Sequence, residues 1–316
     1  MICFYNESHD PYFNLAVEEY LLKEKKDEFI VISVNDPSVI IGKHQVAHRE
    51  TDTEQVTRNK IPVIRRITGG GTVYHDHGNV NFAFILNSEP GRQVDFRKYT
   101  LPVMGFLKYF GVNAEFGDKN DIRAEGFKIS GNAEHVYRNR VLHHGTLLFD
   151  ADLQMLRSVI RKATDKYITR AVRSNPSPVT NLKGKMRDID SVSGFITAIM
   201  VWLSSYFGGD VIKSLTDEDA MKIYHLSADK YRKWDWNYGY GPEYIFSNDF
   251  ILEGLPHHCT FEVKEGIIIK SKISGLPEME NISAKLTGYP HMPDEMYDLF
   301  RKNNCPVSWD DIFNFF

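Results

Sequence analysis

The 316-residue sequence has few cysteines and no strong excess of charge of either sign. Its three cysteines, Cys3, Cys259 and Cys305, are too far apart for a paired metal-ligand motif, and their odd number does not make an even-numbered disulfide set. A reducing compartment is the simplest setting for such a chain, so we expect a cytoplasmic protein. The formal net charge of -4 gives no electrostatic basis for bulk nucleic-acid binding. We therefore expect no nucleic-acid partner.

Several sequence signals are also absent. The first residues, Met-Ile-Cys-Phe-Tyr-Asn-Glu, lack the basic region and apolar core of a signal peptide. No apolar run approaches the roughly 20 residues of a membrane-spanning helix, so we expect no membrane contact. Neither Gly-x-x-x-x-Gly-Lys-Ser/Thr nor a Gly-x-Gly-x-x-Gly leading into a helix occurs. A nucleotide site in this chain would have to be a strand–turn–strand one.

The segment from Arg65 to Phe84 is the most informative part of the chain. Two arginines precede three consecutive glycines, Gly69 to Gly71, and an alternating apolar run over 80–86 predicts a strand. Consecutive glycines cost backbone entropy, so they are tolerated where φ is positive or where the backbone approaches a ligand. Amide groups in such a turn can converge on an anion, and arginine supplies a planar donor fork for phosphate or carboxylate. A tight hairpin turn with two surface arginines fits the same residues.

Two further motifs carry polar side chains into strand-like segments. Lys128 runs into Ser130-Gly131, which places an ammonium beside a backbone that can be closely approached. Such a lysine can pair with a carboxylate and a phosphate at once. The second motif, residues 143–146, is His-His-Gly-Thr and opens another apolar strand. The His75-x-His77 pair suggests a metal, but no third ligand has a convincing spacing, which favours structural or substrate-positioning roles.

The three motifs together resemble those of the lipoate–protein ligase A family. They are Arg-Arg-x-Thr-Gly-Gly-Gly-x-Val-Tyr-His-Asp-x-Gly-Asn, Lys-x-Ser-Gly-Asn-Ala and His-His-Gly-Thr-Leu-Leu, in the order of the family. The resemblance covers residues 1–245 well and the tail more loosely. It implies an α+β fold with mixed and antiparallel sheets and packed helices, like class II synthetases and biotin/lipoate ligases. The expected domains are a catalytic domain at 1–245 and a small α+β accessory domain at 246–316.

The resemblance also implies a two-step reaction. Lipoate and ATP, with Mg²⁺, give lipoyl-AMP and pyrophosphate, and a lysine of an acceptor then takes the lipoyl group. The implied acceptors are apo lipoyl domains of 2-oxoacid dehydrogenase complexes and the glycine cleavage H protein, and a monomer is expected. An octanoyl or lipoyl transferase using an acyl carrier or preformed lipoyl-AMP is the main alternative, although no cysteine lies in the motifs. A biotin ligase and a lipoate-binding protein without activity are further alternatives.

The family assigns roles to residues of these motifs. Lys128 is the expected catalytic residue, bridging a lipoyl oxygen and the α-phosphate. Arg66 is expected to bind phosphate with help from Arg65, and Asp121 to lie near the phosphates and Mg²⁺. The other expected ligand-binding residues are Lys43, Gly69, Gly70, Gly71, Thr72, Val73, Tyr74, His75, Asp76, Asn79, Ser130, Gly131, His144, Gly145 and Thr146.

Periodicity and turn residues predict the remaining elements. Helices are expected at about 11–26, 47–59, 94–110, 192–207, 217–231 and 292–302, and strands at 249–254, 258–264 and 266–273. In the first helix, Asn14 and Glu18 fit a solvated or capping face. The basic segment 170–187 is expected to be a loop, which either closes over an anionic adenylate, steers an acidic partner, or is a solvated linker.

Overall fold

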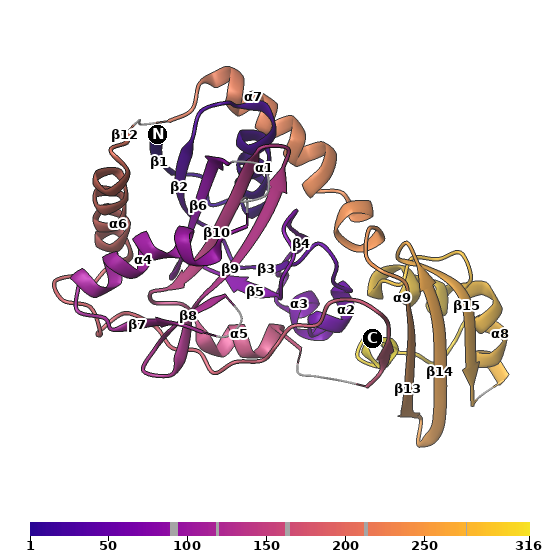
Figure 1. Ribbon diagram of the computed structural model, residues 1–316. Helices are drawn as coiled ribbons and strands as arrows, with labels where there is room; N and C mark the ends of the chain where they lie inside the picture. Colours follow the sequence, from indigo (N-terminus) through magenta and orange to yellow (C-terminus); the bar gives the residue numbers. More distant parts are fainter. Residues whose placement is uncertain (89–93, 118–119, 162–164, 212–213, 276) are drawn as a thin grey trace.

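The computed structural model describes residues 1–88, 94–117, 120–161, 165–211, 214–275 and 277–316 (Figure 1). Its largest element is an eight-stranded sheet in the order β12-β1-β2-β6-β10-β9-β8-β7. Strand β1 is parallel to both β2 and β12, and the other pairs are antiparallel. The strands are β1 (Ile2–Asn6), β2 (Phe29–Val34), β6 (Asn79–Asn87), β7 (Ala114–Phe116), β8 (Asp121–Ala124), β9 (Phe127–Tyr137), β10 (Arg140–Leu148) and β12 (Asp210–Val211).

Helices cover both faces of this sheet because its strands are apolar on both sides. Helices α4 (Phe96–Tyr109) and α6 (Val192–Phe207) bury Phe106 and Phe195 against Phe82 and Phe84 of β6. On the other face, α1 (Pro11–Glu24) and α7 (Asp217–Leu226) form a core with Val31, Ala83 and Ile85. Pro102 lies inside α4, which continues to Tyr109.

Helix α1 begins where the sequence predicts it, since the Asp10 side chain accepts a hydrogen bond from the Tyr12 N–H and Pro11 opens the first turn. The expected solvated face is wrong for Asn14, which is only 6% exposed. Asn14 and Glu18 are spaced four residues apart and precede Leu21 and Leu22 on the same side of the helix, so they belong to the stripe that faces the sheet.

A three-stranded sheet, in the order β4-β3-β5, packs beside the large one. It contains β3 (Ser38–Ile41), β4 (Val63–Arg65) and β5 (Val73–His75). The predicted helix at 47–59 is two short helices, α2 (Ala47–Glu50) and α3 (Thr53–Arg58), because Asp52 caps a new helix through the Gln55 N–H. With α5 (Leu153–Val159) they enclose a small core of their own.

The C-terminal part has a separate sheet, in the order β11-β13-β14-β15 (Figure 1). Its strands are β11 (Tyr167–Ile168), β13 (Tyr244–Leu252), β14 (Leu255–Lys264) and β15 (Ile267–Ser274). Helices α8 (Pro277–Leu286) and α9 (Pro293–Lys302) and the 3₁₀ turn η3 (Asp311–Phe315) complete its core. The strand predicted at 249–254 starts earlier, at Tyr244. Helix α8 was not predicted from the sequence.

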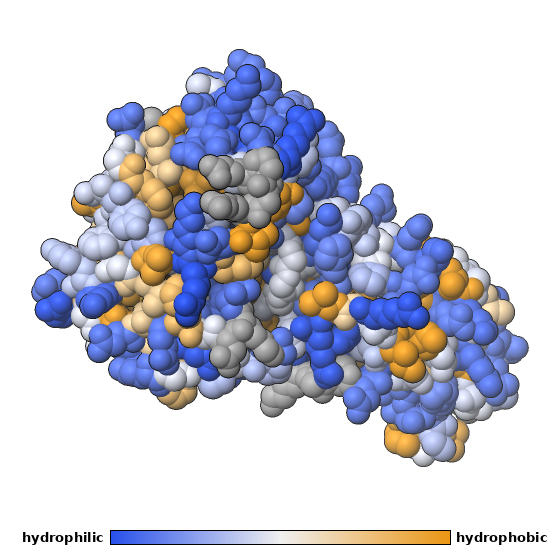
Figure 2. Space-filling model, viewed as in Figure 1, coloured by the Kyte–Doolittle hydropathy of each residue, from blue (hydrophilic) through white to orange (hydrophobic). Residues whose placement is uncertain are grey.

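Helix α7 leads into this part through two π-helical turns, η1 (Ser227–Tyr231) and η2 (Asp235–Gly239). The predicted helix at 217–231 is therefore α-helical only to Leu226. Figure 2 shows a mostly hydrophilic surface on the viewed side, with apolar side chains in separate patches. Among the described residues, no helix combines the length and apolar character needed to cross a bilayer.

Candidate active site

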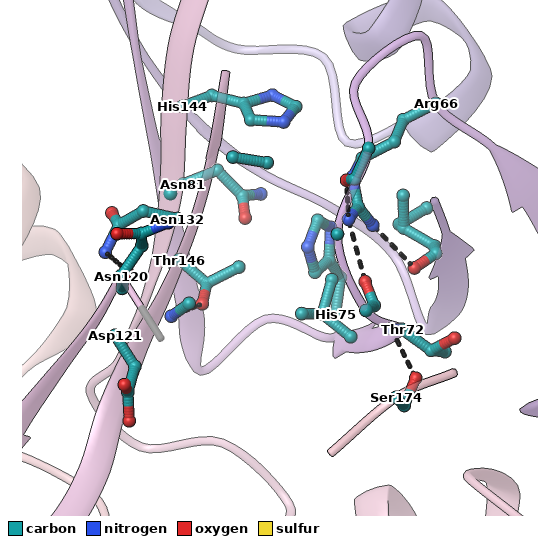
Figure 3. Close-up of a pocket in the computed structure, with 18 of the residues that line it drawn as sticks. Arg66, Thr72, His75, Asn81, Asn120, Asp121, Asn132, His144, Thr146 and Ser174 are labelled. Carbon is teal, nitrogen blue, oxygen red and sulfur yellow. Dashed lines mark hydrogen bonds between the residues drawn. The ribbon is translucent and has the colours of Figure 1, made fainter. Parts of the chain in front are cut away.

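A cavity of about 570 Å³ lies where the large sheet, the small sheet and α1 meet (Figure 3). The glycine turn between β4 and β5 forms one wall, and β9 and β10 form the opposite wall. Thirteen of the predicted site residues line it. They are Arg66, Gly69, Gly70, Gly71, Thr72, Val73, His75, Asp121, Lys128, Gly131, His144, Gly145 and Thr146.

The glycine turn is held from within by Arg66. Its Nη2 donates to the carbonyls of Gly69 (2.5 Å) and Gly71 (2.7 Å), and its Nε donates to Thr68 Oγ1 (2.7 Å). Gly70 has φ +87°, and a Cβ there would lie 3.0 Å from Arg66 Nη2. Burial lowers the pKa of Arg66 to about 10, so the guanidinium remains a cation at neutral pH. The turn therefore places a fixed positive charge in the cavity wall.

Arg65 has a different position from the predicted one. It is fully buried outside the cavity lining, and its guanidinium donates to five backbone carbonyls. These belong to Gly42, Lys43, Gln45, Trp236 and Asn237. The expected role of Arg65 in phosphate binding stays a prediction, and in this structure its donors join the loop after β3 to η2. Consecutive residues at a strand end point in opposite directions, which separates the two arginines.

Lys128 lies in the cavity wall on β9. Its backbone N–H donates to the Pro178 carbonyl (2.9 Å), and its carbonyl accepts from the Thr180 N–H (3.2 Å). A Cβ at Gly131 would lie 3.2 Å from Lys128 Nζ, so the glycine leaves room for the ammonium. Among the described residues, no side chain accepts a hydrogen bond from that ammonium.

Cations outnumber anions in the lining near Lys128. Burial lowers the pKa of Lys128, Asp121 opposes that change, and Arg66 and Arg123 add to it. Asp121 is 4% exposed, and its Oδ2 accepts a hydrogen bond from Arg123 Nε at 2.9 Å. Like charges held together out of water destabilise one another, so this region is suited to an anionic ligand that separates them.

Polar side chains form the floor of the cavity. The Asn14 amide donates to Asn35 Oδ1 (2.6 Å), which turns the Asn35 amide nitrogen toward His75 Nδ1 (2.8 Å). His75 Nδ1 therefore accepts, and the proton of the neutral ring lies on Nε2, a buried atom without a hydrogen-bond partner. Burial lowers the pKa of His75 to about 3, so this ring is neutral at physiological pH. The cavity thus contains an unpaired N–H donor.

Asn81 and Ser33 extend this floor, and neither is among the expected ligand-binding residues given above. The Asn81 amide oxygen accepts from Asn79 Nδ2 (2.7 Å), while its own amide nitrogen is buried without a partner. Asn79 lies outside the lining and acts by orienting Asn81. A buried asparagine pair in an otherwise apolar strand is the signal that could have identified Asn81, because such groups need a partner.

The two histidines of the third motif point to opposite faces of β10. His144 pairs with Glu18 Oε2 (2.7 Å) and Thr68 Oγ1 (2.8 Å) at the cavity, while His143 pairs with Glu134 in the α4 core. Gly145 is required for packing, because a Cβ there would lie 2.2 Å from Asn132 Oδ1. These contacts make Glu18 part of the site, which the expected solvated face did not include.

Four other predicted residues lie outside the main cavity lining. Asp76 accepts from the Gly78 N–H (2.9 Å) and the Asp152 N–H (2.6 Å), so it stabilises a turn. Lys43 lies beyond the end of β3, with its Nζ 5.9 Å from the centre of the Tyr240 ring. Tyr74 and Ser130 line an adjoining cavity of about 330 Å³. That cavity also has four arginines in its wall, Arg49, Arg157, Arg161 and Arg173.

The basic segment at 170–187 crosses the cavity as an anchored loop. Ser174 Oγ accepts hydrogen bonds from the Thr72 N–H (2.9 Å) and from Gln45 Nε2 (3.0 Å). Figure 3 shows Ser174 next to Thr72 at this contact. Residues 174–177 line the main cavity, and the loop also hydrogen-bonds β9 at Lys128. It therefore connects the glycine turn to the strand that carries the central lysine.

Comparison with known proteins identifies the family. Residues 10–203 match the family described as the lipoyl protein ligase A/B catalytic domain. Lipoate–protein ligase 1 of Staphylococcus aureus is 36% identical over 309 residues, which covers 93% of each chain. A lipoate–protein ligase of Bacillus subtilis is 35% identical over 287 residues, covering 87% of this chain and 86% of the relative.

Solved structures of similar proteins contain ligands of interest. A Thermoplasma acidophilum protein described as a lipoate protein ligase with bound lipoic acid has a TM-score of 0.64 and 27% identity, covering 74% of this chain and 98% of its own. A lipoate–protein ligase A bound with ATP has a TM-score of 0.64 and 27% sequence identity, covering 75% of this chain and 98% of its own. A bi-partite ligase studied with its E2 lipoyl domain, also from T. acidophilum, has a TM-score of 0.65 and 26% sequence identity, covering 75% of this chain and 96% of its own. The chain therefore belongs to the lipoate–protein ligase family.

Proposed function

We propose that this chain is an ATP-dependent lipoate–protein ligase. It converts lipoate and ATP into lipoyl-AMP and pyrophosphate, then transfers the lipoyl group to a lysine of a lipoyl domain. The observation that carries the proposal is that Lys128, Arg66 and the glycine turn all line one cavity. Relatives named lipoate–protein ligase and similar structures with lipoic acid or ATP bound support the substrates.

The lipoyl chain is proposed to cross the large sheet from Lys128 toward α1. Thr146 Oγ1 accepts from the Gly131 N–H (3.2 Å), Thr146 pairs with Asn81, and Asn81 pairs with Ser33. Neighbouring strands are about 4.8 Å apart, so Asn81 lies roughly 10 Å from Gly131 across two spacings. That distance suits an extended lipoyl chain whose carboxylate meets Lys128 and whose ring reaches Asn81 and Ser33.

In the first step, a carboxylate oxygen of lipoate attacks the α-phosphorus of ATP and pyrophosphate leaves. The Lys128 ammonium lies between two anions and stabilises the charge that builds on the phosphate oxygens. In the second step, the acceptor amine attacks the lipoyl carbonyl and AMP leaves. Both steps require charge neutralisation and alignment more than a protein nucleophile. Loss of Lys128 is expected to cost about 3 kcal/mol, roughly a hundredfold in rate.

Mg²⁺ is the proposed metal cofactor of the reaction. Mg²⁺ prefers oxygen ligands and is commonly held by one or two carboxylates plus substrate phosphates. Asp121 supplies a buried carboxylate in the lining, and the adjacent Arg123 engages one of its oxygens. We assign Asp121 as the protein ligand. When bound, the ion would offset the negative charge of the pyrophosphate group.

The acceptors are proposed to be apo lipoyl domains of 2-oxoacid dehydrogenase complexes and the glycine cleavage H protein. A similar bi-partite ligase has been studied with its E2 lipoyl domain, which supports this class of partner. Three free, buried thiols suit a reducing compartment, which supports a proposed location in the cytoplasm. We also propose that the protein is a monomer. Residues 1–245 and 246–316 are the proposed catalytic and accessory domains.

A transferase that forms an acyl thioester is the main competing function. Such an enzyme needs a reactive cysteine at its site. All three cysteines are buried, and none belongs to the described lining of either cavity. Burial raises the pKa of Cys3 to about 11 and that of Cys259 to about 12, which suppresses the thiolate. The thiols of this chain are therefore poor nucleophiles.

Pyrophosphate release with ATP, Mg²⁺ and lipoate tests the proposal, with and without an apo lipoyl domain whose mass is recorded. We expect lipoate-dependent release and a lipoyl mass gain, both reduced about a hundredfold in Lys128→Ala. Lys222→Ala is the matched control, because Lys222 is exposed on α7 and pairs with Glu218. Acyl transfer from an acyl-carrier thioester, without any ATP-dependent release, would contradict the ligase function.

A further inference from the structure

One histidine of the His75-x-His77 pair has no place in the site above. His75 is buried in the cavity floor, whereas His77 lies on the outside, in the turn after β5. There it meets Asp36, from the turn between β2 and β3, and His9, from the segment before α1. One ligand atom from each of these three exposed side chains lies within 4.8 Å of the other two.

The three side chains are brought together by bonds that already exist. The Asp36 N–H donates to the His9 carbonyl (2.7 Å), and His77 Nε2 is 2.7 Å from Asp36 Oδ1. The rings of His9 and His77 have centroids 5.1 Å apart. Asp10, the residue after His9, is paired with Arg232, and this pairing offsets the positive charge of the arginine. The group is thus preorganised and not opposed by an unpaired cation among the described contacts.

We propose that His9, Asp36 and His77 form a surface binding site for Zn²⁺. Two imidazoles and one carboxylate are ligands that zinc accepts in open sites, where water takes the fourth position. Zinc bonds to nitrogen and oxygen are about 2.0–2.2 Å long, so ligand atoms less than about 4.4 Å apart can share the ion. The three ligand atoms now lie within 4.8 Å of one another, and small rotations of these exposed side chains would bring them close enough to share one zinc ion.

The site is linked to the cavity by sequence adjacency. Asp36 follows Asn35, and His77 is two residues from His75. Asn35 and His75 are hydrogen-bonded to each other inside the molecule, at 2.8 Å. An ion outside would therefore fix the same two turns that this hydrogen bond fixes inside. Because the unfolded chain lacks the assembled site, zinc is expected to stabilise the folded protein.

A simple surface ion pair between His77 and Asp36 is the alternative explanation. The chain offers a matched control for it, since His258 Nδ1 is also 2.7 Å from an exposed carboxylate, that of Asp249. Among the described residues, the His258 pair belongs to no group of three potential ligands, whereas His77 does. The zinc hypothesis therefore depends on His9.

The test is titration of the full-length, tag-free protein with ZnCl₂ by calorimetry, with the unfolding temperature measured in parallel. The variants are His9→Ala, His77→Ala and the control His258→Ala. We expect one equivalent of zinc to bind the wild type and the control alike. Binding should weaken by at least about tenfold in each of the other two, the scale on which even outer-shell changes act.

Substitution with Co²⁺ provides an independent readout, because its visible spectrum reports imidazole coordination. The wild type is expected to give that spectrum and His9→Ala to lose it. Equal zinc affinity in the wild type and His9→Ala would overturn the proposal and leave a surface ion pair only. Equal loss of affinity in His258→Ala would overturn it too, because binding would then be unspecific. Neither result depends on ligase activity.

Discussion

Adjacent arginines have opposite roles in this protein. Arg66 faces the cavity, while Arg65 joins two loops through backbone carbonyls. Sequence resemblance gave both the same role, because a motif records identity and spacing but not the direction of a side chain. The structure separates them through burial and hydrogen-bond partners.

Replacement of Arg65 by lysine is expected to reduce stability more than catalysis. Lysine cannot reach five carbonyls from one planar group, so several buried acceptors lose their donors. Unpaired buried groups cost about 1–3 kcal/mol each, and we expect the free energy of unfolding to fall by about 3 kcal/mol. Urea denaturation measures this, with exposed Arg58→Lys as the control. A raised KM for ATP at unchanged stability would instead assign Arg65 to the phosphates.

Asn81 is expected to influence which acid is used. Asn81 lines the cavity where the lipoyl ring is proposed to lie, and its buried amide nitrogen has no hydrogen-bond partner. Ring sulfur can accept a weak hydrogen bond, whereas the methyl end of octanoate cannot. Asn81→Leu should therefore lower the ratio of kcat/KM for lipoate to that for octanoate by about tenfold. Equal losses with both acids would refute this role.

At the scale of elements, a single serine anchors the loop at 170–187 to the glycine turn. Ser174 Oγ contacts the Thr72 N–H and Gln45. Ser174→Ala removes these hydrogen bonds from a surface loop, so we expect little change in stability. Their loss should weaken substrate binding by about 1 kcal/mol, which corresponds to a fivefold to tenfold rise in KM. Steady-state kinetics with ATP and lipoate measure the effect, and Ser193→Ala, at an exposed position of α6, is the control. An unchanged KM would mean that the anchor has no part in substrate binding.

Local sequence signals predicted the elements that form locally. The predicted start of the first helix coincides with the Asp10 cap and Pro11 of α1, and the strands predicted at 258–264 and 266–273 form the β14–β15 hairpin. Strand β11 was not predicted, because its two residues pair with β13 residues 77 and 79 positions later and have no periodicity of their own. The burial of Asn14 was missed for a similar reason, since its partner Asn35 comes from another strand end.

For the candidate site too, the sequence did not predict which side chains meet in space. The three motifs do lie around one cavity, which their order along the chain did not require. The roles of Lys128 and Asp121 stay predictions, whereas Arg65, Asp76, Asn79 and Lys43 lie outside both linings. Motif resemblance therefore located the site, but hydrogen-bond geometry was needed to separate residues of the lining from residues that support it.

At the scale of the whole molecule, two buried histidines join the N-terminal part to the C-terminal part. His48 Nε2 donates to the His291 carbonyl (2.7 Å), and His291 Nε2 donates to the Phe315 carbonyl (2.7 Å). The opposite ring nitrogens accept from Thr53 and Tyr244 hydroxyl groups. Carbonyls only accept, so both rings are neutral, with the proton on Nε2. The ring of Phe316 stacks on His291, with centroids 4.5 Å apart.

This contact predicts loss of stability in mild acid. Burial lowers the pKa of His291 to about 4 and the pKa of His48 well below its usual range. The positive charge of Arg161 further lowers the pKa of His48. In the unfolded chain a histidine has a pKa of about 6.5, so below that pH the unfolded state binds more protons than the folded state. The free energy of unfolding should therefore fall as pH decreases from about 6.5 toward 4, by up to about 1.4 kcal/mol per pH unit for each such histidine.

Unfolding by urea across this pH range measures the slope, and a His48→Gln variant isolates the contribution of the contact. Glutamine retains a donor and an acceptor but does not titrate, so the slope should decrease by up to one proton. His75 also titrates on unfolding, because its pKa is lowered to about 3, and a smaller slope must remain in the variant. An identical slope in both proteins would mean that His48 is already protonated in the fold or accessible to water. In that case the two parts would not be joined through a neutral histidine.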